Sequence, residues 1–88
     1  SCNKLMVVQG TPDCLHKTEA AVDSFFSGKV HISMRNVTEN SFELVYSIGE
    51  GILDHAAKQN QMDISEKLIK MDGVKRINIV YQKDELSQ

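Results

Sequence analysis

Residues 63–81, DISEKLIKMDGVKRINIVY, constrain the fold most, because they carry a helix start, a helix stop and a strand in one continuous run. Asp63 has the short carboxylate that caps a helix, and Glu66 stands where a capping box has its second acid. Apolar residues then recur at helical spacing as far as Gly73, whose residue type readily takes the left-handed conformation at a helix end. They are Ile64, Leu68 and Met71. After Gly73 the apolar period changes to two, which predicts a tight turn and a strand. The alternating residues are Ile77, Ile79 and Tyr81.

The preceding sequence predicts three more strands and one helix. Residues 4–9 (KLMVVQ) are apolar without alternation, as in a strand covered on both faces. A helix is predicted over residues 12–27, between the Gly10–Thr11–Pro12–Asp13 turn and Gly28. Residues 29–37 and 41–48 alternate on either side of a short polar turn, which predicts an antiparallel hairpin. Residues 52–62 are ambiguous: their composition favours a helix, but the apolar stripe is weak, so a loop and a backward extension of the next helix both stay open.

This order of elements, βαββαβ, predicts an α+β fold of the ferredoxin-like (ACT-like) type. A four-stranded antiparallel sheet would carry two helices on one face, with the first and third strands central. The 88 residues are predicted to form a single domain, residues 1–88, with a disordered polar tail over residues 82–88. The side chains expected between sheet and helices are Val30, Ile32, Met34, Phe42, Leu44, Tyr46, Ile77 and Ile79.

The other face of the sheet is also predicted to be partly apolar. It carries Val45, Val80 and two residues of the first strand, with His31 on the same side. An exposed apolar sheet face usually marks an interaction surface. We therefore predict that Val45, Val80 and His31 lie in an interface, either with a second copy of the chain or with an attached transmembrane domain.

Composition and motifs exclude several classes of function. A net charge of −2 and a pI near 5.8 argue against a nucleic-acid surface, which needs a basic stripe. The sequence has no phosphate-binding glycine loop and no recognisable set of nucleophile and base, so no catalytic residue and no cofactor is predicted. Cys14 and His16 are two positions apart and do not share a helix face, so no metal site is predicted either. Cys2 and Cys14 are expected to be free thiols. An acylphosphatase-type enzyme would need an arginine in the first loop and an asparagine on the third strand, and neither is present.

The turn at Gly10–Thr11–Pro12–Asp13 is the one candidate ligand site. A helix start beside a glycine offers free backbone N–H groups to an anion such as a carboxylate. In ACT-type regulatory domains, which share this layout, the equivalent turn helps to bind amino acids. Gly10, Thr11 and Asp13 are therefore the candidate residues for a small anionic ligand, and the alternative is a helix start with ordinary turn chemistry.

Three segments resemble the soluble C-terminal domain of an uncharacterised family of bacterial multi-span membrane proteins, often encoded beside polyphosphate-polymerase-type domains. They are KLMVV in the first strand, SFELVYSI in the third strand and EKLIKMDGV at the second helix and its stop. The resemblance implies a cytoplasmic domain at the inner membrane without catalytic motifs, and the missing initiator Met fits a piece of a longer chain. Residues and resemblance together predict a non-enzymatic accessory domain for regulation or assembly. The alternative is an ACT-type sensor of a small carboxylated ligand.

Overall fold

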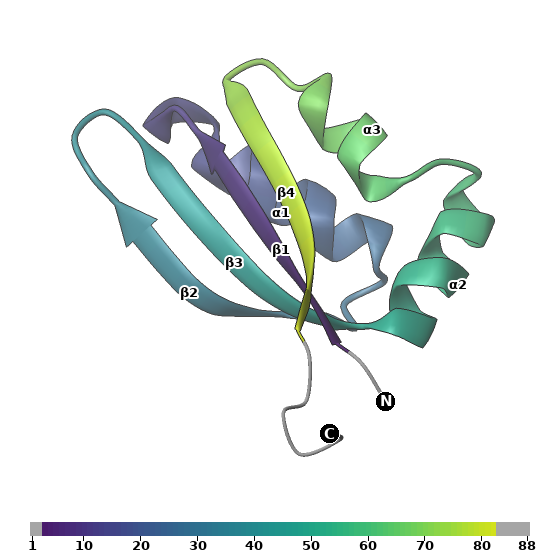
Figure 1. The fold of residues 1–88 in the computed structure, drawn as a ribbon. Coiled ribbons are helices and arrows are strands. Elements are labelled where there is room, and N and C mark those ends of the chain that lie inside the picture. The colour runs from purple at the N-terminus through teal and green to yellow at the C-terminus, as the bar shows by residue number, and fades with distance from the viewer. Residues whose placement is uncertain (1–2, 83–88) are drawn as a thin grey trace.

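A computed structural model describes residues 3–82 of the chain, which form four strands and three α-helices (Figure 1). Strand β1 spans Asn3–Gly10, and a 3₁₀ turn η1 (Pro12–Cys14) leads into helix α1 (Leu15–Phe25). The hairpin of β2 (His31–Val37) and β3 (Phe42–Gly49) follows. Helices α2 (Glu50–Asn60) and α3 (Ile64–Ile69) then lead to β4 (Val74–Gln82). No helix within residues 3–82 is long and apolar enough to cross a lipid bilayer.

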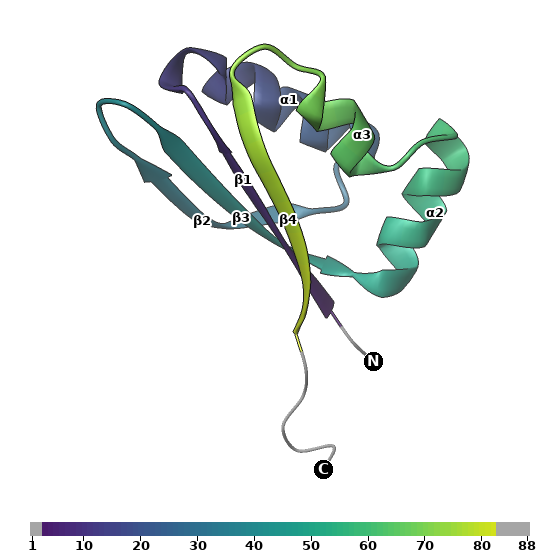
Figure 2. The same cartoon turned by 45° about the horizontal axis from the view of Figure 1, so that its top comes forward.

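The sheet is antiparallel with strand order β2-β3-β1-β4, which confirms the predicted ferredoxin-like fold. β1 and β3 are the central strands, as the continuous apolar run of β1 indicates. Figures 1 and 2 show the helices on one side of the sheet and the other side bare. Burial on one face and exposure on the other explains why β3 alternates strictly between buried and less buried residues.

The hydrophobic core lies between the sheet and helices α1 and α3. Met6 and Val8 of β1 and Leu44 of β3 are fully buried there. The three helices add Thr18, Val22, Phe25, Ala56, Ile64 and Leu68 to the core, and Phe26 follows directly after α1. The predicted capping box is formed, since the Asp63 backbone N–H donates to the Glu66 carboxylate over 3.3 Å. Gly73 ends this segment at φ +91°, as the helix stop predicts.

The predicted alternation of β2 was wrong beyond Ile32. The register shifts between Ile32, which pairs with Tyr46, and Met34, which pairs with Val45. This bulge moves Met34 to the bare face, where its side chain is 41% exposed. It also turns Arg35 toward the helices, where its Nε donates to the Glu19 carboxylate over 2.9 Å. A one-residue slip exchanges the two faces of a strand, so the error passes to every later residue of β2.

Residues 52–62, left open by the sequence, belong mainly to a separate helix. α2 ends at Asn60, and Gln61 takes the left-handed conformation at φ 56° before the cap of α3 at Asp63. The segment is therefore neither a loop nor an extension of α3, and the sheet carries three helices where two were predicted. The predicted tail falls outside the described residues except for Gln82, whose backbone ends β4.

Candidate functional site

The bare face of the sheet holds an apolar patch, the first of three candidate surfaces. Strand pairing sets Leu5 beside Val80 and Val7 beside Val45, and Val45 also pairs with Met34. We refer to these five residues as the apolar patch. Val80 is 48% exposed, and the residues of β1 and β3 are half-buried by their neighbours. No helix in the described part of the chain lies on this face (Figure 1).

Polar residues border the apolar patch along the sheet. In one row across the strands, Glu43 pairs with Gln9, and Gln9 pairs with Arg76. Gln9 Nε2 donates to Glu43 Oε2 over 2.6 Å, so the Gln9 amide is held between the acidic Glu43 and the basic Arg76. His31 lies on this face at the edge strand, opposite Ser47, where the sequence places it. Val45, Val80 and His31 therefore share one face, although they come from three strands.

The predicted ligand site at the β1–α1 turn is largely occupied by its own contacts. The Thr11 backbone N–H donates to the Gly73 carbonyl over 2.9 Å, and the Thr11 hydroxyl donates to Asp13 Oδ1 over 2.5 Å. The hydroxyl stabilises the carboxylate and lowers the pKa of Asp13 below its ordinary value. A negative charge at Asp13 opposes binding of a second carboxylate in this turn. The carboxylate site thus stays a prediction, with Asp13 as the residue least suited to it.

A shallow hollow of about 560 Å³ lies beside this turn, against the β2–β3 hairpin. Gly10 and Thr11 line it, but Asp13 does not, so the three predicted residues do not converge on one space. Its charged lining residues are Glu43 and Lys75, one of each sign. The hollow therefore has no net preference for an anion.

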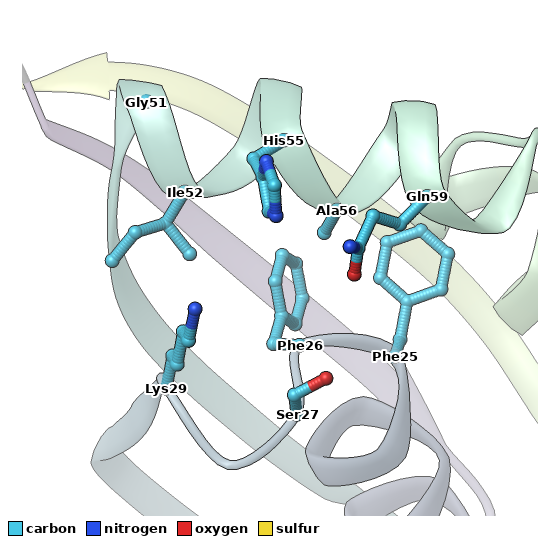
Figure 3. Close-up of a pocket in the computed structure, with 9 residues that line it drawn as sticks. All are labelled: Phe25, Phe26, Ser27, Lys29, Gly51, Ile52, His55, Ala56 and Gln59. Carbon is cyan, nitrogen blue, oxygen red and sulfur yellow. The ribbon is translucent and has the colours of Figure 1, made fainter.

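A smaller pocket of about 280 Å³ lies between helix α2 and the turn from α1 to β2 (Figure 3). Its apolar lining comes from Phe25, Phe26, Ile52 and Ala56, and its polar lining from Ser27, Lys29, His55 and Gln59. We call this space the helix pocket. Sequence reasoning missed it, because its upper wall is the ambiguous segment 52–62. The only signal in the sequence was the alanine, glutamine and lysine content that favours a helix there.

Cys14 and His16, the pair of possible metal ligands in the sequence, do not share one environment in the structure. Cys14 is a free thiol, 4% exposed, whereas the neighbouring His16 side chain is 95% exposed, so the two point to different environments. Within residues 3–82, no three histidine, cysteine or acidic side chains are grouped to hold a metal ion. Cys2 lies outside the described residues, and its predicted state stays a prediction.

Comparison with known proteins shows similarity at the level of structure. No protein-family model and no curated protein matches the chain. A transcriptional regulatory protein of the AsnC family from Pyrococcus furiosus is similar in structure over 96% of this chain, with a TM-score of 0.44 and 16% sequence identity. The match covers 51% of that protein, so this chain spans about half its length. A similarity of this size carries no argument about function, which must come from the surfaces described above.

Proposed function

We propose that this domain is a non-enzymatic assembly module that self-associates through the bare face of its sheet. One observation carries the proposal: the apolar patch is left uncovered by the chain's own helices. Met34 and Val80 are 41% and 48% exposed on this face. Removing apolar surface from water stabilises association by roughly 25 cal/mol per Å² before the costs of binding are subtracted.

A second copy of the chain is the partner that this face fits best. Two stacked sheets related by a two-fold axis parallel to the strands would place β2 over the partner's β4 and β3 over the partner's β1. Val45 would then face the partner's Val7, and the apolar patch of one copy would lie on the apolar patch of the other. The polar row would also meet itself, with Glu43 close to the partner's Gln9 and Arg76. Isologous contacts of this kind need such self-complementary surfaces.

The size of the face sets the expected strength of this dimer. Four strands about 4.8 Å apart, each contributing about six residues at about 3.3 Å, give a face of about 400 Å². Stable interfaces usually bury about 800 Å² on each partner. We therefore expect a weak dimer, with a dissociation constant on the order of 10 μM or weaker.

Analytical ultracentrifugation of the 88-residue chain from about 5 μM to 1 mM tests the proposal, with two matched variants. Val80→Glu introduces a charge into the apolar patch, where stacking would bury it without a partner, so it should weaken association at least about tenfold. Val37→Glu is the control: Val37 is also an exposed strand valine, 53% against 48%, but it pairs with Phe42 on the helix side of the sheet. A wild-type chain that stays monomeric at 1 mM would contradict the proposal, as would equal effects of the two variants.

The setting of this module in a longer protein is a second part of the proposal. A position on the cytoplasmic side of a membrane protein rests on the sequence resemblance alone. In that setting, weak stacking would be strengthened, because tethering to a common membrane raises the local concentration of the domains. The full reading frame tests this part: upstream hydrophobic spans of about 20 residues support it, and their absence contradicts it.

A further inference from the structure

We propose that the helix pocket binds a small carboxylate with an apolar body, such as an aromatic or branched aliphatic acid. The apolar body would rest on the Phe26 ring and Ile52, and the carboxylate would contact Lys29 and His55. Figure 3 shows Lys29 and His55 directed into the same space from opposite sides, with Ile52 and Phe26 beside them. This site is separate from the apolar patch, because its lining comes from α2, the end of α1 and the turn that follows.

The walls of the helix pocket explain the apolar part of the ligand. Phe26 is 2% exposed and Ala56 is 5% exposed, so the floor is fixed by the packing of the core. Small-molecule sites typically combine such an apolar lining with a few placed polar groups. A volume of about 280 Å³ corresponds to roughly nine water molecules at about 30 Å³ each. A ligand of roughly nine or ten non-hydrogen atoms, the size of phenylacetate, therefore fits.

The charge of the lining explains the carboxylate. The lining residues include one cation, Lys29, and no aspartate or glutamate. Lys29 makes no ion pair with any described residue, so its ammonium group is available to a ligand. A neutral histidine still offers one ring N–H donor, and the Ser27 hydroxyl and Gln59 amide add more. Phosphate groups usually need several cations or a bidentate arginine, and this lining has neither.

The backbone conformation of the turn after α1 places Lys29 opposite helix α2. Ser27 and Gly28 take left-handed conformations at φ 53° and 73°, and this turns the chain sharply after α1. Lys29 thereby returns to face α2. His55 lies three residues after Ile52 on α2, so the two share one face of that helix. A cation and an apolar helix face thus meet over Phe26.

The test is a titration of the ¹⁵N-labelled chain with phenylacetate at pH 7, followed by amide shifts in NMR spectra. We expect saturable shifts confined to residues 25–29 and 51–59, with a dissociation constant on the order of 0.1–1 mM. Phenylacetamide, which has the same shape without the charge, should bind at least about fivefold more weakly. Lys29→Gln should weaken phenylacetate by a similar factor, whereas Lys17→Gln on the exposed surface of α1 should not change it.

Several outcomes would overturn the inference. They are the absence of saturable shifts at the lining residues, equal binding of phenylacetate and phenylacetamide, and equal effects of the two lysine variants. Shifts at Gly10 and Thr11 with a silent helix pocket would move the ligand to the β1–α1 turn and also contradict it. Repeating the titration on Val80→Glu keeps the result apart from the proposed self-association: this variant should bind phenylacetate as the wild type does, whether or not the wild type dimerises.

Discussion

The close approach of Gly10 and Gly73 gives the sharpest test of how this fold is held together. A Cβ atom added at Gly73 would lie 2.7 Å from Thr11 Oγ1 and 2.8 Å from Cys14 Sγ. A Cβ added at Gly10 would lie 2.6 Å from the Gly73 carbonyl oxygen and 2.9 Å from the Phe42 ring. The same carbonyl accepts a hydrogen bond from the Thr11 backbone N–H. The two glycines therefore allow the β1–α1 turn to pack closely against the start of β4.

Two effects add at Gly73 and only one acts at Gly10. At φ +91°, an alanine at Gly73 is strained by about 1–2 kcal/mol, and the overlap with Thr11 and Cys14 adds about 1–3 kcal/mol. Gly73→Ala should therefore lower the free energy of unfolding by about 2–5 kcal/mol. Gly10 has no positive φ, so Gly10→Ala should lower it by the overlap alone, about 1–3 kcal/mol. A domain of this size has a total of roughly 5 kcal/mol, so Gly73→Ala brings it close to unfolding.

Gly51→Ala is the matched control for this pair. Nothing lies within 4 Å of a Cβ added at Gly51, which stands in the first turn of α2. Since alanine favours a helix over glycine, this variant should be more stable by about 0.5 kcal/mol. Urea unfolding followed by far-UV circular dichroism measures the stability of all three variants. A shift of the midpoint urea concentration reports a change in stability, provided that the m-value is unchanged. A loss below about 1 kcal/mol for Gly73→Ala, or destabilisation by Gly51→Ala equal to that of Gly10→Ala, would refute the reasoning.

Two further predictions concern a buried tyrosine and the break between α2 and α3. Burial raises the pKa of Tyr46 from 10.0 to about 12, so its contribution to stability is complete below pH 10 and is lost as the pH rises toward 12. The free energy of unfolding, measured from pH 9 to 12, should decline in this way in the wild type and should decline less steeply in Tyr46→Phe. Gln61→Gly should raise the free energy of unfolding by about 0.5 kcal/mol, because glycine adopts the left-handed backbone conformation at this position without steric strain. Gln59→Gly within α2 should lower it by about 1 kcal/mol, because glycine disfavours a helix interior. If both glycine variants changed the free energy of unfolding in the same direction, the left-handed conformation of Gln61 at the end of α2 would be contradicted.

Sequence reasoning succeeded where a local signal and the tertiary packing agree. The capping pair Asp63 and Glu66 and the stop at Gly73 are read from residue types that the backbone needs at those positions. The unbroken apolar run of β1 placed that strand in the centre, because only a strand with neighbours on both edges and cover on its face buries Met6 and Val8 fully. The alternation of β3 and β4 predicted correctly that Val45 and Val80 lie on the same face of the sheet.

The bulge in β2 could not be read from the sequence, because Val30, Ile32 and Met34 alternate without interruption. The contacts that accompany the shifted register join residues far apart in the chain. Once the strand slips, Arg35 reaches Glu19 of α1, and Met34 joins the apolar patch. An exposed ion pair contributes at most about 1 kcal/mol, so it does not produce a pattern visible in composition. The same slip enlarges the patch that the sequence had only partly identified.

The helix pocket could not be predicted for a related reason. α2 has a single buried residue, Ala56, so its apolar stripe is weak and a helix could not be separated from a loop. Its end also carries no glycine, since Gln61 takes the left-handed position that would normally signal the stop. Both features have one structural consequence. A helix anchored by a small alanine and free to turn away from α3 leaves space above Phe26, and this space is the helix pocket. The segment that the sequence describes least clearly is therefore the one that builds the wall of the helix pocket.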